Sequence, residues 1–137
     1  MKQTKQSLSK NNGSLDKLWR SVGKENAKCE VCETLPVNER FNYTKIDPHH
    51  IIKRGHKATR WDIRNRLWVC SSHHTLGKKT VEYNESGWFW NEGPCWLRTH
   101  RTNDYYYLNG KKHETKQWTL EELEKLYSAL YSLAGET

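Results

Sequence analysis

The sequence has no long apolar run and few aliphatic side chains. Only 34% of its 137 residues are hydrophobic, and the mean hydropathy is −1.05. A helix that crosses a bilayer needs about 20 consecutive apolar residues, so we expect no membrane partner. Residues 1–13 are polar and rich in lysine, without the apolar core of a signal peptide. We therefore expect a flexible basic tail over 1–13 and a cytoplasmic protein.

Cysteine is scarce as well, with four residues in the chain. In a reducing compartment, cysteines in C-x-x-C spacing favour metal ligation over disulfides. The low apolar content leaves a thin core for one small domain. Seven tryptophans and seven tyrosines partly compensate, because each aromatic side chain buries a large area. A structural metal would compensate further, since its binding free energy becomes folding free energy.

Acidic residues are outnumbered by basic ones. The chain has 23 Lys and Arg against 16 Asp and Glu, which gives a net charge of +7 and a pI of about 9.3. Such an excess suits a polyanionic partner, most simply nucleic acid. Basic surfaces also serve solubility, so the charge becomes informative only beside a functional motif.

Two ligand pairs with the same spacing predict a closed metal site. Two residues separate Cys29 from Cys32, and Cys70 and His73 repeat that spacing about forty residues later. Four such ligands fit a tetrahedral structural zinc ion. Cys95 lies outside this pattern, and we favour a partly buried free thiol over a ligand role for it.

The segment from Cys29 to His74 has four more polar side chains that the zinc site does not need: His49, His50, Asn65 and His74. A His-His pair precedes two isoleucines, an asparagine precedes an apolar strand ending in cysteine, and a histidine follows the last zinc ligand. This order resembles the HNH endonucleases, the ββα-metal nucleases of homing enzymes, colicins, restriction enzymes and bacteriophages. The resemblance covers residues 29–76, and the stretch HKATRWDIRN resembles short bacteriophage members, which act in the host cytoplasm.

The resemblance implies a role for each of these side chains. His50 would be the general base that activates water, while His49 and His74 would hold a divalent ion. Mg²⁺ is one candidate for that ion, and imidazole ligands also suit Mn²⁺, Ni²⁺, Co²⁺ or Zn²⁺. Asn65 would be a polar clamp that holds the loop and orients the base. DNA is the implied substrate, with 5′-phosphate and 3′-hydroxyl products.

The family usually has a cysteine where this chain has His73. Successive helical residues diverge by about 100°, so His73 and His74 would serve different ions. The spacing from Cys70 assigns His73 to zinc and His74 to the catalytic ion, and the swapped assignment stays open.

Four arginines crowd the segment between the histidine pair and the second strand: Arg54, Arg60, Arg64 and Arg66. Guanidinium groups match phosphate bidentately, so we expect at least one to bind nucleic acid, and we favour Arg60. The alternative function is a zinc-binding module that binds nucleic acid without cleaving it.

We expect an α+β fold with a ββα-metal core over residues 14–80. A helix should begin at Ser14 and end at Gly23, with a strand over 41–46 that Pro48 interrupts. A basic loop over 53–62 should lead to a second strand over 67–70. A helix capped by Ser71 or Ser72 should follow it.

Residues 81–137 should form an aromatic-rich extension and a C-terminal helix packed on the core. Asn109 and Gly110 predict a hairpin between 105–108 and 111–114. The aromatics form either a second small hydrophobic cluster, which we favour, or a base-stacking surface. A capping box at Thr119 starts a helix of about 16 residues, whose apolar stripe is core or, alternatively, a homodimer interface.

Overall fold

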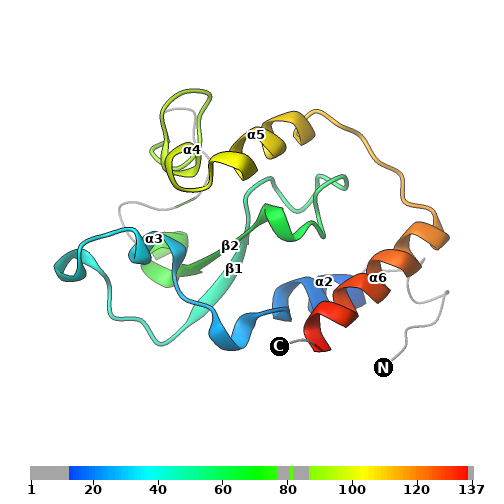
Figure 1. Cartoon of the computed structure of the whole chain (residues 1–137), viewed down its shortest axis with the longest axis horizontal. Coiled ribbons are helices and arrows are strands. Elements are labelled where there is room, and N and C mark those ends of the chain that lie inside the picture. Colours follow the sequence, from blue (N-terminus) through cyan, green and yellow to red (C-terminus); the bar gives the residue numbers. More distant parts are fainter. Residues whose placement is uncertain (1–12, 77–80, 82–86, 136–137) are drawn as a thin grey trace.

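The computed structural model of the chain describes residues 13–76, 81 and 87–135. A two-stranded antiparallel sheet lies at its centre, formed by β1 (Ile46–His50) and β2 (Arg66–Cys70). Helices surround this hairpin on several sides (Figure 1). The expected combination of helices with one small sheet is therefore confirmed.

The first strand begins later than the sequence predicted. We expected a strand over 41–46 that Pro48 interrupts, but Pro48 lies inside β1 and residues 41–45 have no regular structure. Pro48 pairs with Trp68 of β2, whose backbone N–H donates to the Glu30 carboxylate at 2.7 Å rather than to β1. Pro48 and Trp68 are therefore a non-hydrogen-bonded pair, in which the backbone nitrogens point away from the partner strand. The N–H that proline lacks would make no ladder hydrogen bond here, so proline is tolerated on this edge strand.

Helix α2 (Gly13–Ser21) forms close to its predicted bounds. Leu15 and Trp19, four residues apart, are both fully buried on one face. Gly23 follows with a φ of 77°, a left-handed conformation that favours glycine at the end of a helix. Three short turns then lead to β1: η1 (Lys24–Asn26), α3 (Glu30–Glu33) and η2 (Val37–Glu39).

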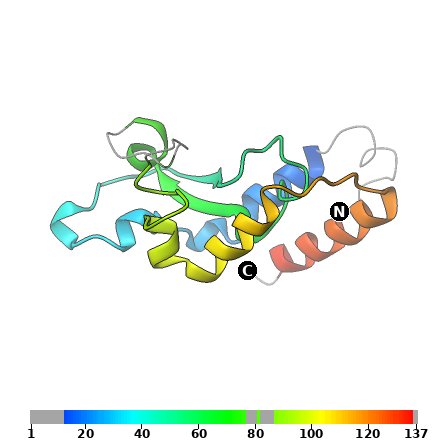
Figure 2. The ribbon, with the colours of Figure 1, turned by 90° about the horizontal axis from the view of Figure 1, so that it is seen from above.

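The C-terminal helix α6 (Leu120–Gly135) starts at the predicted capping box. The Thr119 N–H donates to Glu122 at 3.1 Å, and the Glu122 N–H donates to the Thr119 hydroxyl at 3.2 Å. Figures 1 and 2 show α6 beside α2, so the chain returns to its first helix. The predicted apolar stripe is core, in a cluster built around Leu15, Trp19, Trp61, Leu123 and Leu130.

The predicted hairpin over residues 105–114 is wrong. The structure has two helices in this region, α4 (Trp96–His100) and α5 (Thr102–Lys111), and the Asn-Gly dipeptide falls inside α5. Tyr105 and Leu108, three residues apart, are both buried against the main core. Burial at helical spacing outweighs the local turn preference here.

The main core lies between the sheet and the helices α3, α4 and α5. Aromatic side chains of the extension, including Phe89 and Trp90, are buried in this core and do not form the separate second cluster that the sequence favoured. Two turns flank β2: η3 (Ile63–Asn65) precedes it, and η4 (Ser72–Leu76), a π-helical turn, follows it. Among the described residues, no helix has the length and apolar content that a membrane span requires.

Candidate metal centre and neighbouring histidines

Four buried side chains converge where α3, β2 and η4 meet: Cys29, Cys32, Cys70 and His73. The Nδ1 atom of His73 lies 3.4 to 3.5 Å from each of the three Sγ atoms. Two of the sulfurs, those of Cys32 and Cys70, are 3.9 Å apart. A tetrahedral zinc ion spaces its sulfur and nitrogen ligands about 3.6 Å apart and two sulfurs about 3.8 Å apart. This cysteine–histidine cluster can therefore hold a metal ion such as zinc.

Short-range contacts shape the cluster. Cys29 caps α3, and its Sγ accepts from the Cys32 N–H at 3.5 Å while its own N–H donates to the Tyr43 hydroxyl at 2.8 Å. Phe41 packs edge-on against the His73 ring, with the two ring centroids 5.0 Å apart. Burial raises the pKa of the Cys32 thiol to about 12. The thiolate that a metal requires is therefore disfavoured in this site unless a cation binds there.

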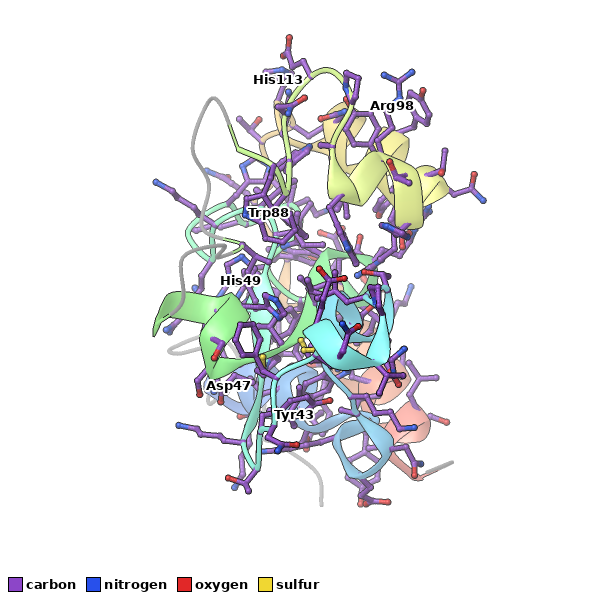
Figure 3. All side chains as sticks on the ribbon, turned by 90° about the vertical axis from the view of Figure 1, so that its left-hand side faces the viewer. Tyr43, Asp47, His49, Trp88, Arg98 and His113 are labelled. Atoms are coloured by element: carbon purple, nitrogen blue, oxygen red, sulfur yellow. The ribbon has the colours of Figure 1, made fainter. Side chains whose placement is uncertain are left out.

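His74 turns away from the cluster toward β1. Its ring centroid lies 5.2 Å from that of His49, with the planes at 71°, and its Nδ1 is 3.9 Å from Oδ2 of Asp47. Figure 3 views this side of the molecule, with His49 and Asp47 near the green turn η4. Two imidazoles on one tetrahedral ion have centroids about 5 Å apart. The spacing of His49 and His74 is therefore compatible with a shared ion, and His73 is the histidine of the cluster.

The side chains of His49, His74 and Asp47 lie farther from one another than those of the cysteine–histidine cluster. Among the described residues, only the cysteine–histidine cluster brings three or more ligand atoms within 4.8 Å. Burial, and after it the nearby His74 and His50, lowers the pKa of His49 to about 4, although a hydrogen bond to the Val81 backbone opposes this. His49 is therefore neutral at neutral pH, as a metal ligand must be.

Asp47 was missed by the sequence reasoning. Side chains two apart on a strand share a face, so Asp47 and His49 lie on the same side of β1. The signal was present in the sequence, but the strand was predicted over 41–46 instead of Ile46–His50. With the correct strand, an acidic side chain beside His49 would have been an obvious candidate ligand.

His50 lies on the opposite face of β1 from His49. Its ring stacks on the indole of Trp19, with centroids 3.8 Å apart and planes at 10°. Its Nε2 is 2.8 Å from the carbonyl oxygen of Arg60. A carbonyl only accepts, so Nε2 carries the hydrogen and Nδ1 of the neutral ring keeps its lone pair. Burial lowers the pKa of His50, although the Arg60 carbonyl and Asp16 oppose this, so the neutral ring is favoured.

Asn65 is fully buried at the end of η3, directly before β2. Its Oδ1 accepts from the Ile52 N–H at 2.7 Å, and its Nδ2 donates to the carbonyls of Ile52 and Thr59 at 3.1 and 3.2 Å. The side chain thus ties the residues after β1 to the basic loop. These contacts match the loop-holding part of the role expected of Asn65, and they require an amide because the side chain donates and accepts at once. Its expected part in orienting the base stays a prediction.

The four candidate arginines make intramolecular contacts. Arg60 binds Asp16 of α2 through Nε at 3.0 Å and Nη2 at 2.7 Å, and Arg54 reaches the same carboxylate at 3.3 Å. Arg64 and Arg66 also donate to acceptors on other elements. The favoured Arg60 is only 18% exposed, whereas Arg54 is 66% exposed. Arg54 is therefore the better placed of these two for an incoming phosphate.

Cys95 is buried outside the cluster, with its Sγ 3.8 Å from the Asn91 carbonyl oxygen, as the free-thiol interpretation predicted.

Comparisons with family models, curated proteins and solved structures found no match to this chain.

Proposed function

We propose that the protein is a metal-dependent endonuclease of the HNH type that hydrolyses phosphodiester bonds in DNA. The pairing of His49 with His74, whose ring centroids are 5.2 Å apart, carries this proposal. These imidazoles belong to β1 and to the turn that follows β2. A buried cluster suited to zinc lies at the other side of the same turn.

The cluster suits a structural role. All four of its side chains are buried, and together they fill the coordination of a tetrahedral ion. Zinc bound there would tie α3, β2 and η4 together. Because His74 follows the ligand His73 directly, the same ion would fix the turn that presents His74 to His49.

The histidine pair suits an open site. The side chains of His74 and Asp47 are 26% and 23% exposed, so a phosphate can approach them. Two imidazoles, with a carboxylate nearby, leave coordination positions for water and phosphate oxygens. A divalent ion bound there would stabilise charge that develops on the phosphate and on the leaving oxygen.

His50 suits the role of the general base. Its hydrogen-bonded Nε2 leaves Nδ1 free to accept a proton, and burial keeps the ring neutral. In an in-line displacement, the attacking water and the leaving oxygen lie on opposite sides of phosphorus. Neighbouring strand residues that face opposite ways can flank such a phosphate, with His50 toward the water and His49 toward the leaving oxygen.

The charge of the molecule supports DNA as the substrate. The net charge is +7, and Lys53, Arg54 and Lys57 are exposed on the loop that follows the histidine pair. Loops rich in exposed cations bind the phosphate backbone without reading sequence. One such site per chain cuts one strand at a time, so a double-strand break would need a homodimer or two visits.

Nicking of supercoiled plasmid tests the proposal. We expect purified protein with Mg²⁺ or Mn²⁺ to leave 5′-phosphate and 3′-hydroxyl ends, and EDTA to stop the reaction. His50→Ala should lower the rate about 100-fold or more, while His113→Ala, a change at an exposed histidine, should not. Binding without cleavage under every divalent ion would instead support a non-catalytic zinc module.

A further inference from the structure

The indole of Trp19 is the surface on which the His50 ring rests. The two rings are nearly parallel and 3.8 Å apart. Trp19 is itself fully buried and is held at two points. Its Nε1 donates to the Asp62 carbonyl at 2.9 Å, and its own carbonyl accepts from Arg66 at 2.6 Å. The indole is therefore a fixed platform and not a mobile neighbour.

Helix α2 constrains the His50 ring in two independent ways. Stacking on Trp19 fixes the plane of the ring, while the hydrogen bond to the Arg60 carbonyl fixes which nitrogen is protonated. Arg60 is in turn held by Asp16 of α2 through two hydrogen bonds, at 3.0 and 2.7 Å. Thus α2, which lies outside the segment that holds the histidines and cysteines, contacts His50 directly and anchors its hydrogen-bond acceptor.

We propose that Trp19 is a positioning residue for the general base. The stacked indole holds His50 in the one ring orientation in which Nε2 donates to Arg60 and Nδ1 remains free to accept a proton. This inference rests on the proposed function, because it assigns a task to the base. Without the indole, the imidazole can rotate about its χ2 angle, and the hydrogen bond alone has to select the orientation. Fixed orientation of a catalytic group is a recognised source of rate.

A purely structural role for Trp19 must be separated from this one, since Trp19 also packs in the cluster between α2 and α6. Trp118, which is half-buried, offers a control in that cluster. It packs against Trp61, with ring centroids 5.7 Å apart, and donates to the Lys57 carbonyl at 3.0 Å. Replacing either tryptophan by leucine removes the same atoms from one cluster, but only one of them stacks on His50.

The first arm of the test needs no cleavage. Zinc-loaded protein with nitrogen-15 histidines is compared by NMR at neutral pH, and the His50 signals are assigned by their loss in His50→Ala. Wild type, Trp19→Phe and Trp118→Leu should show only the Nε2–H tautomer of His50. Trp19→Leu should show a mixture of the two tautomers. A single, unchanged tautomer in Trp19→Leu would overturn the proposal.

The second arm measures nicking kinetics per folded protein. Trp19→Leu should lower kcat about tenfold with KM within about twofold, and Trp19→Phe should restore most of the rate. In a His50→Ala background, Trp19→Leu should have no further effect, because the contact acts through His50. A further loss in that background would show that Trp19 affects the rate independently of His50, and would overturn the proposal. If wild type never nicks, the proposed function fails, while the NMR arm still decides whether Trp19 orients His50.

Discussion

Removing one sulfur from the buried cluster should cost the protein its fold. Cys70 ends β2 and is fully buried, and the other ligands come from α3 and η4. Structural zinc contributes about 10–16 kcal/mol in small domains, whereas a whole domain is stable by only about 5–15 kcal/mol. A serine hydroxyl does not ionise at neutral pH and is a poor zinc ligand. Cys70→Ser should therefore lose most of the metal contribution and be largely unfolded at room temperature.

Thermal melting by circular dichroism, together with the tightly bound zinc per chain, measures this effect. Cys95→Ser is the matched control, because Cys95 is also buried but lies outside the cluster. Its Sγ contact with the Asn91 carbonyl is long, at 3.8 Å, so we expect a loss of about 1 kcal/mol and unchanged zinc. A Cys70→Ser protein that melts cooperatively within a few degrees of wild type would show that a metal ion in the cluster does not hold the fold together.

Three further outcomes follow from the same contacts. Asp47→Asn should raise the Mn²⁺ concentration needed for nicking about tenfold without changing the melting temperature, and an unchanged Mn²⁺ titration would count against a role for Asp47 at the metal. Thr119→Ala should lower the free energy of unfolding by about 1 kcal/mol, because it removes half of the capping box of α6; denaturant unfolding measures this. Burial raises the pKa of Asp104, but hydrogen bonds from Arg64 and Arg101 outweigh it, so its pKa is lowered on folding. The contribution of Asp104 to the free energy of unfolding is therefore present above its unfolded pKa of about 4, and it is lost as the pH falls through its folded pKa. The stability difference between wild type and Asp104→Asn, measured at matched pH, should shrink on acidification, and a constant difference would contradict this.

The features that the sequence predicted correctly are local ones. Cys29 and Cys32 lie on one turn, and Cys70 and His73 lie across the end of one strand, so spacing alone sets their geometry. The capping box that begins at Thr119 also acts within one turn. In each case the interacting atoms are three residues apart, and the intervening backbone has few conformations to choose from.

Contacts between distant segments leave no pattern in the local sequence from which they could be predicted. Asp16 and Arg60 are 44 residues apart, and nothing in either segment alone predicts their pairing or the stacking of Trp19 on His50. The wrong hairpin has the same origin, because burial of Tyr105 against a distant core overrides a local turn preference. These tertiary contacts also decide how the candidate base is held, which the order of motif residues leaves open.

Whether two different ions bind in this fold can be measured by anomalous diffraction from crystals soaked in Mn²⁺, since it separates zinc from manganese. We expect a zinc peak among the three cysteines and His73, and a manganese peak between His49 and His74 that disappears in His74→Ala. Manganese bound elsewhere, with no peak between these two histidines in a protein that nicks DNA, would contradict this expectation.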